Sequence, residues 1–415
     1  MERVVITGMG VVSPLGNSVD CLWNNILAGK LGFSPLSDRV RPDFSVKLAG
    51  IVNDFDPAKY FDKKEERRTS RFTQFAVTAA LDAIEDAGTD FADIDPYRAG
   101  VICGVGIGDL ELTTTESIKY NEKGPDRVSV FYIPMTIGNM AAGTVAMKAA
   151  AVKNIHLNGD NLCTTTACSS ATHAIGEAFR KIKDGYLDVC IAGGAESCLS
   201  EFALAGFNNM KALSRSDDPA RCSIPFDLER NGFVMGEGSG MLVLERLDHA
   251  LARGARIYAE IAGSGATGDA YHMTSPSPTG DAAAHAMKMA YTEAGLSAAD
   301  IDYINAHGTS THLNDLYETI AIKKALGDHA KNVVINSTKS MTGHLLGAAG
   351  GVEAIVTALS IKNNIVHRTV GYTTPDPECD LDYCISGNRE MTVNAALSNN
   401  LGFGGHNATV CLKKV

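Results

Sequence analysis

The sequence predicts a layered α/β protein made of two related halves. Apolar runs of strand length alternate along the chain with longer segments of helical period, and this alternation is typical of helices packed on sheets. A short pattern also recurs at a constant offset, which indicates an internal duplication. The 415 residues suffice for more than one minimal domain or for one large duplicated unit.

Six apolar segments have the length and composition of buried strands. They are residues 4–12, 99–103, 189–192, 240–244, 301–305 and 333–336. Residues 70–87 predict a helix, because their apolar side chains recur on one face. That face comprises Phe72, Phe75, Ala76, Ala79, Ala83, Ile84 and Ala87. Gly88 follows, as expected for a glycine that ends a helix in the left-handed conformation.

Each copy of the repeat consists of a predicted helix end followed by the same tetrapeptide. Ala87-Gly88 leads into ADID at residues 92–95, and Ala294-Gly295 leads into ADID at residues 299–302. Both elements have the same offset, 295 − 88 = 299 − 92 = 207 residues. Four-residue matches arise by chance, but a shared offset with matching neighbours favours two related halves.

A glycine-bearing strand precedes each copy of the repeat. It reads TGMG at residues 7–10 and AGSG at residues 262–265. We therefore predict two halves, residues 1–255 and 256–415, with the seam near residues 254–257. No low-complexity linker marks the seam, so we expect the halves to pack tightly as one unit.

Composition restricts the classes of function. The net charge is 37 − 48 = −11, which argues against general affinity for nucleic acid or an anionic membrane. The N-terminus opens directly on a strand-like run without the layout of a signal or transit peptide, and no apolar run is long enough to span a bilayer. The ten cysteines form no CxxC pair. We expect a cytoplasmic protein with reduced thiols and no membrane insertion.

Three short segments carry the chemistry. They read TTACSS at residues 165–170, NAHGTST at 305–311 and KSMTGH at 339–344. Cys168 precedes a helix-like segment rich in small residues, where the helix dipole favours thiolate. A free cysteine is more often a buried core residue, but the two histidine motifs favour a nucleophile that can carry an acyl group.

The two motif histidines differ in setting from the others. His307 follows an apolar strand, where sites collect in α/β sheets, and His344 lies in a loop of small residues. Two imidazole donors could stabilise the oxyanion and enolate of a carbon–carbon condensation. The glycine-rich segments at 8–13 and 104–108 lack a complete Rossmann or P-loop pattern, so we exclude a phosphate cradle there.

These motifs, in this order, resemble the elongating β-ketoacyl-[acyl-carrier-protein] synthases of type II systems, within the thiolase-like superfamily. The similarity runs nearly the whole chain, from RVVITG at residues 3–8 to FGGHN at residues 403–407. Other matching stretches are AGGAE at 192–196, PFD at 225–227, GFVMGEG at 232–238 and AYHMTSP at 270–276. The resemblance implies a duplicated five-layered αβαβα sandwich, with the nucleophile in residues 1–255 and the catalytic histidines in residues 256–415.

The resemblance also implies a ping-pong condensation in fatty acid elongation. Cys168 would take an acyl chain from acyl-carrier protein, and malonyl-acyl-carrier protein would then lose carbon dioxide and attack the thioester. His307 and His344 would stabilise the enolate. The further implied roles are an oxyanion hole from the backbone N–H groups of Cys168 and Phe403, a gate at Phe403 and Gly404, a supporting ion pair of Lys339 and Glu353, pantetheine contacts from Thr309 and Thr311, and an acyl pocket lined by Ile107 and Phe207.

Partners follow from the same resemblance. Acyl-carrier proteins are acidic, so a local basic surface should bind them; we predict Lys63, Lys64, Arg67, Arg68 and Lys211. A homodimer is implied, and no cofactor is required. Some relatives hold a sodium or potassium ion near the positions that match Asn305, Glu353, Asn399 and Asn400.

Other proteins of related function would differ from this sequence at particular residues. A thiolase would need a second cysteine in the C-terminal loop, which here reads LGFGGH at residues 401–406. A starter synthase that uses acyl-CoA would carry Cys-His-Asn, against which the segment at 339–344 argues. A non-catalytic partner subunit would have lost the nucleophile, and Cys168 is present. A ketosynthase of a type II polyketide or polyene pathway stays open.

Overall fold

The computed structural model describes residues 1–37 and 39–415. Ten of its strands form one continuous sheet. In the described chain their order is β10-β9-β13-β14-β8-β1-β7-β6-β4-β5. The first half supplies β1 (Val4–Val12), β4 (Ala99–Gly104), β5 (Asn161–Thr164), β6 (Val189–Glu196) and β7 (Gly238–Arg246). The second half supplies β8 (Ala259–Gly268), β9 (Tyr303–Asn305), β10 (Val334–Asn336), β13 (Ala395–Gly402) and β14 (His406–Lys413). All six strands expected from the sequence are confirmed.

The two halves have the same topology. The order β5-β4-β6-β7-β1 is repeated as β10-β9-β13-β14-β8. In each half the first three strands of this order pair in parallel and the remaining contacts are antiparallel. The halves meet where Val4, Val5 and Ile6 pair antiparallel with β8. The strand order therefore shows the duplication, while the boundary at residues 255 and 256 stays a prediction.

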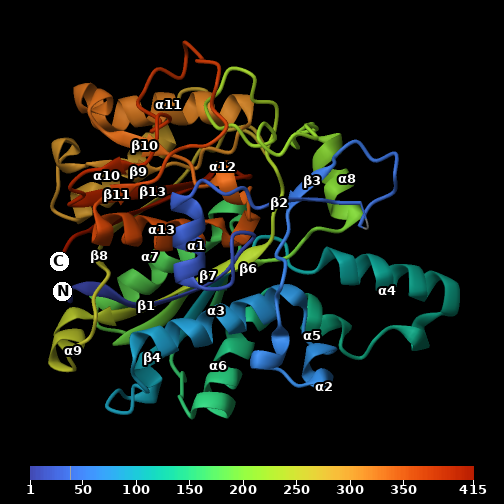
Figure 1. The fold of residues 1–415 in the computed structure, drawn as a ribbon. Helices are drawn as coiled ribbons and strands as arrows, with labels where there is room; N and C mark the ends of the chain where they lie inside the picture. Colours follow the sequence, from blue (N-terminus) through green and yellow to red (C-terminus); the bar gives the residue numbers. More distant parts are fainter. Residues whose placement is uncertain (38) are drawn as a thin grey trace.

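Helices make the three remaining layers. On one outer face, α3 (Arg71–Ala87) and α6 (Met140–Lys153) pack against the strands of the first half. On the other outer face, α10 (Asp281–Glu293) and α11 (His312–Leu326) cover the strands of the second half. Between the two sets of strands lie α7 (Ser170–Lys183) and α13 (Ala349–Asn363) (Figure 1). This αβαβα sandwich confirms the predicted thiolase-like fold.

Glycines in β1 and β8 explain the matching sequence patterns at the start of each half. A Cβ atom on Gly8 would lie 2.1 Å from the carbonyl oxygen of Ala83 in α3. A Cβ atom on Gly263 would lie 2.1 Å from the carbonyl oxygen of Ala290 in α10. Both helices can approach their strand only because no side chain intervenes. The predicted helix over residues 70–87 is confirmed as α3, and Gly88 ends it with φ 66°.

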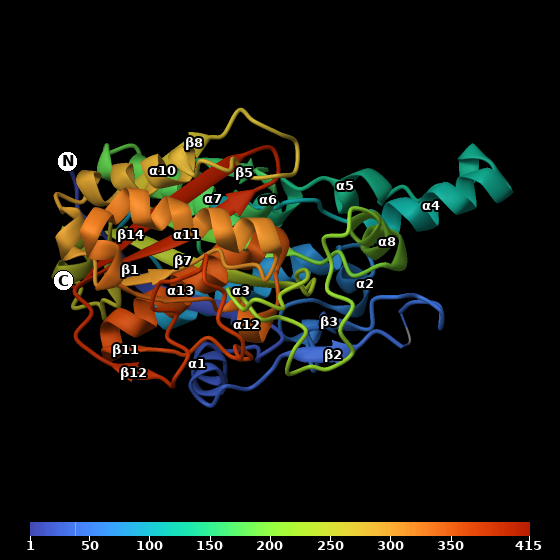
Figure 2. The ribbon, with the colours of Figure 1, turned by 90° about the horizontal axis from the view of Figure 1, so that it is seen from above.

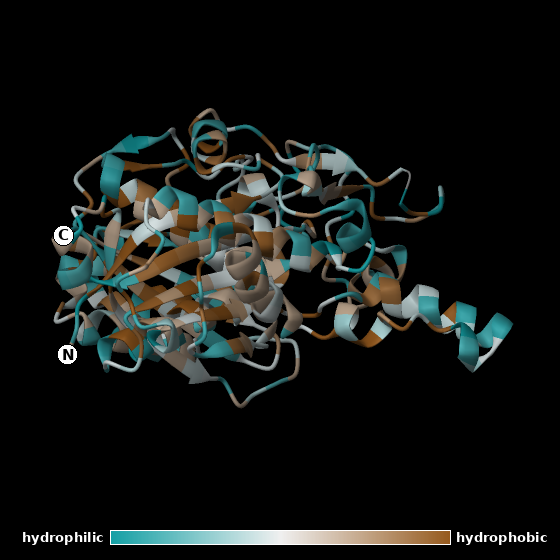
Figure 3. Cartoon of the chain, turned by 90° about the horizontal axis from the view of Figure 1, so that it is seen from below, coloured by the Kyte–Doolittle hydropathy of each residue, from teal (hydrophilic) through white to brown (hydrophobic). Residues whose placement is uncertain are grey.

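The remaining elements surround this core. They are α1 (Val19–Leu27), α2 (Lys63–Glu66), α4 (Leu110–Lys123), α5 (Tyr132–Thr136), α8 (Glu201–Asn209), α9 (Leu247–Ala252) and α12 (Lys339–Thr342), and the short pairs β2 (Phe33–Pro35) with β3 (Leu48–Gly50) and β11 (Ile365–Val366) with β12 (Arg389–Glu390). Helix α4 projects from the body of the molecule (Figure 2). Its far end is hydrophilic, whereas apolar residues are concentrated in the sheet and the helices beside it (Figure 3). Of the helices in the described chain, none is both long and apolar enough to cross a bilayer.

Candidate active site

Cys168, the predicted nucleophile, lies in a tight turn between β5 and α7. Cys168 is only 8% exposed, and Ala167 before it has φ 51°, a left-handed conformation that a non-glycine residue adopts at some energetic cost. The hydroxyl of Ser170 donates to the Ala167 carbonyl at 2.7 Å and accepts the Thr166 N–H at 2.9 Å. Small hydroxyl residues around the cysteine therefore satisfy the polar backbone of the turn.

Burial keeps the Cys168 thiol protonated in the resting chain. Loss of water raises the pKa of the thiol to about 12, against the lowering effects of the Lys339 ammonium and the backbone N–H groups of Phe403 and Cys168 itself. The Glu196 carboxylate adds to the rise. The expected thiolate is therefore not favoured at rest, because desolvation outweighs the effects of the ammonium and the two backbone N–H groups.

A chain of hydrogen bonds fixes the ring of His307, just beyond the end of β9. The Thr172 hydroxyl donates to the Oδ1 atom of Asn400, so that the Nδ2 atom of Asn400 can donate to Nδ1 of His307 at 3.2 Å and to Glu353 at 2.8 Å. With Nδ1 as the acceptor, the proton of a neutral His307 is on Nε2. His307 therefore presents an N–H donor.

His344 has the same tautomer for a different reason. The Leu346 N–H donates to its Nδ1 atom at 3.2 Å. Its Nε2 atom is buried and has no hydrogen-bond partner among the described residues. A buried donor without a hydrogen-bond partner lowers the stability of the folded protein. An active site can retain such a donor because a substrate atom accepts its hydrogen bond in the complex.

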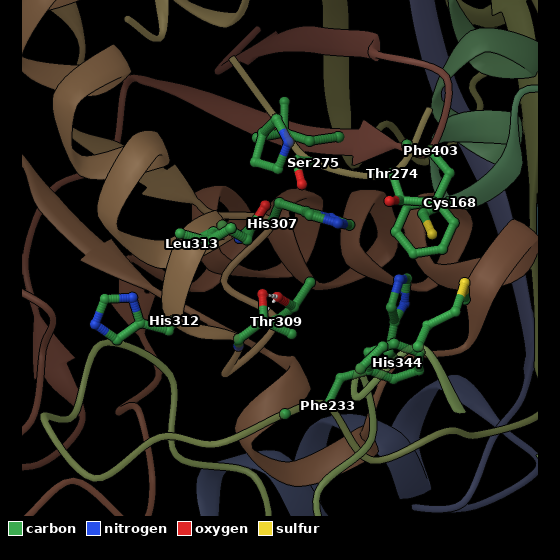
Figure 4. Close-up of a pocket in the computed structure, with 18 of the residues that line it drawn as sticks. Cys168, Phe233, Thr274, Ser275, His307, Thr309, His312, Leu313, His344 and Phe403 are labelled. Carbon is green, nitrogen blue, oxygen red and sulfur yellow. Dashed lines mark hydrogen bonds between the residues drawn. The ribbon is translucent and has the colours of Figure 1, made fainter. Parts of the chain in front are cut away.

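The thiol and the two imidazoles converge on one space. The ligand-type atoms of Cys168, His307 and His344 all lie within 4.8 Å of one another. The two rings are nearly perpendicular, at 86°, with centroids 5.2 Å apart. Figure 4 shows both rings directed towards the side of the cavity that holds the thiol. The structure therefore brings together the three residues that the sequence singled out.

Burial keeps both imidazoles neutral. It lowers the pKa of His307 and of His344 well below 6.5, and the nearby Lys339 ammonium lowers both further. Lys339 is itself buried and forms an ion pair with the buried Glu353, as expected from the sequence. Neutral imidazoles retain one N–H each, which suits stabilisation of an oxygen that becomes negative only during the reaction.

Sequence reasoning missed a buried carboxylate behind His307. Glu318 in α11 accepts the N–H groups of His307 and Gly308, both at 2.8 Å. Burial raises its pKa to about 7. Glu318 follows Asn314 and Asp315 on the buried face of α11, and polar residues at core positions of a helix are the signal that could have identified it.

A cavity of about 310 Å³ leads to the three groups. Phe207, Thr309, Thr311, Lys211 and Phe403 line it, as do Cys168, His307 and His344. The hydroxyls of Thr309 and Thr311 are 2.8 Å apart, so both lie where a polar arm could contact them. The predicted pocket residue Ile107 lies outside this lining and is 37% exposed, and its contact with an acyl chain stays a prediction.

Phe403 lines the cavity in the short turn between β13 and β14. Its ring is 6.3 Å from the ring of Phe207, centroid to centroid. The following residues Gly404 and Gly405 have φ 86° and 75°, a left-handed conformation that glycine adopts without strain. The Gly404 N–H donates to the Met273 carbonyl at 2.7 Å, so it is not directed at the thiol, and the predicted gate stays a prediction.

The basic residues expected to bind a partner lie in two places. Lys63, Lys64, Arg67 and Arg68 are exposed in and after α2. Lys211 lines the cavity, just after α8. Helices α2 and α8 lie well apart in Figure 1. Whether a carrier protein contacts both groups of basic residues stays a prediction.

The residues expected to hold a monovalent cation do not converge as side-chain ligands. The Oδ1 atoms of Asn305, Asn399 and Asn400 each accept a hydroxyl hydrogen bond from a threonine, and Glu353 accepts from Lys339 and Asn400. An ammonium group thus already neutralises the one carboxylate. A monovalent cation held by these four residues stays a prediction, and no step below depends on one.

The thiol and two imidazoles are also of the ligand types that zinc prefers. The same three groups suit acyl transfer, because they supply one sulfur nucleophile and two Nε2–H donors.

Comparisons with known proteins agree with this geometry. The sequence model for the β-ketoacyl synthase N-terminal domain matches residues 1–250, and the model for the C-terminal domain matches residues 258–373. The chain belongs to the β-ketoacyl synthase family. The 3-oxoacyl-[acyl-carrier-protein] synthase 2 of Synechocystis sp. is 46% identical to this β-ketoacyl synthase over 414 residues, which cover 100% of this chain and 98% of the relative. The synthase of the same description from Staphylococcus aureus strain N315 is 48% identical over 413 residues, with the same coverage.

Solved structures show the same fold for this β-ketoacyl synthase. A β-ketoacyl synthase from Burkholderia phymatum superposes with a TM-score of 0.92 and 35% identity over 100% of both chains. A type II polyketide ketosynthase in complex with its acyl-carrier protein superposes with a TM-score of 0.91 and 37% identity, again over 100% of both chains.

Proposed function

We propose that this chain catalyses the decarboxylative Claisen condensation of type II fatty acid elongation. It would join an acyl group from acyl-carrier protein to malonyl-acyl-carrier protein and yield 3-oxoacyl-acyl-carrier protein. The observation that carries the proposal is the convergence of one buried thiol and two neutral Nε2–H donors on a single cavity. The two curated relatives, at 46% and 48% identity, bear the name of this activity.

In the first half-reaction, the sulfur of Cys168 attacks the thioester carbonyl of acyl-carrier protein. The backbone N–H groups of Cys168 and Phe403 both lower the pKa of this thiol, so they lie close enough to hold the oxyanion that forms beside it. The carbonyl re-forms, the carrier thiolate leaves, and the proton of the Cys168 thiol passes to it. The acyl chain is then held on Cys168 as a thioester.

In the second half-reaction, the malonyl C–C bond to the carboxylate breaks and carbon dioxide leaves. His307 and His344 donate their Nε2–H groups to the enolate oxygen that develops. The enolate carbon attacks the thioester carbonyl, and the bond to the sulfur of Cys168 breaks as the oxyanion collapses. The released thiolate takes up one proton from solvent, because the pKa of Cys168 favours the thiol.

A polyketide or polyene ketosynthase is the second candidate. It is supported by the structural similarity to a type II polyketide ketosynthase at 37% identity, which is below the 46–48% of the curated synthases. A non-catalytic partner subunit is not favoured, because the complete thiol and imidazole set is present. Condensation with saturated acyl-carrier proteins of increasing length, compared with poly-β-keto substrates, would separate the two enzymes.

The partners proposed are acyl-carrier protein and malonyl-acyl-carrier protein. One ketosynthase of this fold is described in complex with its acyl-carrier protein, which supports the first. A homodimer and a cytoplasmic location stay predictions. Because Lys211 lines the cavity and residues 63–68 do not, we propose that the carrier contacts Lys211 at the cavity and the basic residues of α2 at a second surface.

Charge reversal tests the docking surface. Lys211→Glu and, separately, Lys64→Glu with Arg67→Glu should raise the KM for carrier-protein substrates, most strongly at low salt. Acylation of Cys168 by a small thioester should not change. Lys414→Glu, on an exposed residue at the C-terminus, is the matched control. If both kinds of acyl donor suffer equally, the residues are structural and the carrier binds at another surface.

A further inference from the structure

The mechanism above does not use Glu196, the last residue of β6. Its carboxylate is fully buried, and it forms none of the ion pairs found among the described residues. A buried carboxylate without a cation is costly to maintain. Other groups beneath the Cys168 turn must therefore stabilise this buried carboxylate.

Backbone N–H groups take the place of the missing cation. Oε2 accepts from Gly106 at 2.9 Å, from Ile107 at 3.1 Å and from Gly347 at 3.2 Å. Oε1 accepts from Gly108 at 3.0 Å. These donors belong to two loops far apart in the sequence, residues 106–108 and residues 346–348. One side chain thus ties both loops together.

The two loops meet directly at this carboxylate. A Cβ atom on Gly347 would lie 2.3 Å from the backbone nitrogen of Gly106 and 2.8 Å from Oε2 of Glu196. A Cβ atom on Gly106 would lie 2.6 Å from the same Oε2 and 3.2 Å from the carbonyl oxygen of Ala167. The carboxylate therefore occupies the junction of both loops with the turn that carries Cys168.

One of these loops controls a catalytic imidazole. The Gly347 N–H is bound to Glu196, and the N–H of the preceding Leu346 is the group that fixes Nδ1 of His344. Leu346 has φ 48°, a conformation that needs support from its surroundings. The other loop carries Ile107, the residue expected to border the acyl chain.

We propose that Glu196 is a positioning residue which holds the imidazole of His344 and the 106–108 loop in register with Cys168. It touches no reacting atom. It acts through the peptide N–H groups of two loops, so that the acyl side and the malonyl side of the site keep one relative geometry. This inference rests on the proposed function, because it assigns the two sides of the site to the two half-reactions.

Glu196→Gln and Glu196→Asp test the role. Glutamine keeps the size but replaces one acceptor oxygen with a donor that faces N–H groups, and aspartate keeps the charge but is too short to reach both loops. For both variants, we expect the kcat of carbon dioxide release from malonyl-acyl-carrier protein to fall about tenfold or more. The KM should stay within about twofold, and the ratio of Cys168 acylation rates for long and short acyl chains should change.

Glu245→Gln is the matched control. Glu245 is equally buried and lies at the opposite end of the β6–β7 pair, where it binds Thr7 and Arg253. We expect it to lower the thermal unfolding midpoint without changing the kcat, the KM or the chain-length ratio of the folded enzyme. A wild-type enzyme that performs neither half-reaction would refute the proposed function. A competent wild type whose Glu196 variants behave like Glu245→Gln would refute only the positioning role.

If both Glu196 variants fail to fold, hydrogen exchange on the unmodified protein tests the positioning role of Glu196. Because one carboxylate holds both loops, the amides of residues 106–108 and of Gly347 should become exposed in one common opening event, with equal protection. Independent exchange of the two loops, with protection differing by tenfold or more, would overturn the proposal.

Discussion

Removal of the His344 side chain should separate the two half-reactions. Nε2 of His344 is a buried donor that finds no partner within residues 1–37 and 39–415, and in the proposed mechanism its first partner is the enolate oxygen that forms as carbon dioxide leaves. Acylation of Cys168 precedes that step and uses backbone donors. His344→Ala should therefore slow decarboxylation strongly and leave acyl transfer within about threefold of the wild type.

The expected magnitude follows from the surroundings of the ring. A donor aimed at developing negative charge in a site without water contributes about 10²–10³ in rate, or ~2.7–4 kcal/mol. His307 presents a second Nε2–H group to the same space, so part of the stabilisation survives in the variant. We expect a loss of about 10²-fold, near the lower end of this range. Between pH 6 and 8 the loss should be constant, because burial keeps the pKa of His344 and of His307 well below 6.5.

Release of labelled carbon dioxide and intact-mass spectrometry of the acylated chain measure the two steps. His329→Ala is the control, since His329 binds the Ile301 carbonyl outside the cavity and its loss removes an imidazole without touching the site. A near-normal release rate in His344→Ala would show that this imidazole does not stabilise the enolate. Equal loss of both half-reactions would show that it supports the structure of the whole site instead.

Three further changes test separate parts of the structure. Cys168→Ala should abolish the acyl adduct seen by intact-mass spectrometry, and an adduct that persists would place the nucleophile elsewhere. Ile107→Phe should shorten the longest acyl chain accepted, because added volume in a packed tunnel causes overlap; an unchanged chain-length profile would show that Ile107 does not border the chain. Glu318→Gln tests the pH dependence of stability: burial raises the pKa of Glu318 from 4.5 to about 7, so the stability from the neutral form is complete below about pH 4.5 and is lost as the pH rises through 7. Urea unfolding at pH 5 and pH 8 should show a fall of about 2.5 kcal/mol in the wild type beyond that in the variant, and equal falls in both would contradict it.

The elements of the fold could be predicted because local pattern and burial agree. The strand at residues 4–12 is a continuous apolar run and is buried along its whole length. Gly8 and Gly263 are needed for close packing of α3 and α10, so the duplication left a trace in the sequence. Cys168, His307 and His344 could be predicted because each lies in a motif whose small neighbours satisfy a tight turn.

Other features depend on contacts that no local pattern records. Glu196 and Glu318 bind peptide N–H groups of distant loops, and any residue type can supply such donors. The pKa of the Cys168 thiol depends mainly on burial, which is set by elements from across the sequence. Lys211 lies in the lining of the cavity and residues 63–68 do not, a difference that only the tertiary structure shows.

Because the two halves share one topology, the surroundings of Gly347 in the second half can be compared with those of Cys168 in the first. Cys168 follows Ala167, with φ 51°, at the start of α7; Gly347 follows Leu346, with φ 48°, at the start of α13. The second half thus carries a second turn of the same hand, with glycine where the first half has cysteine. The backbone of Gly106 fills the space that a thiol would need there. A cysteine at position 347 would therefore clash with Gly106 and Glu196 instead of forming a second copy of the reactive turn.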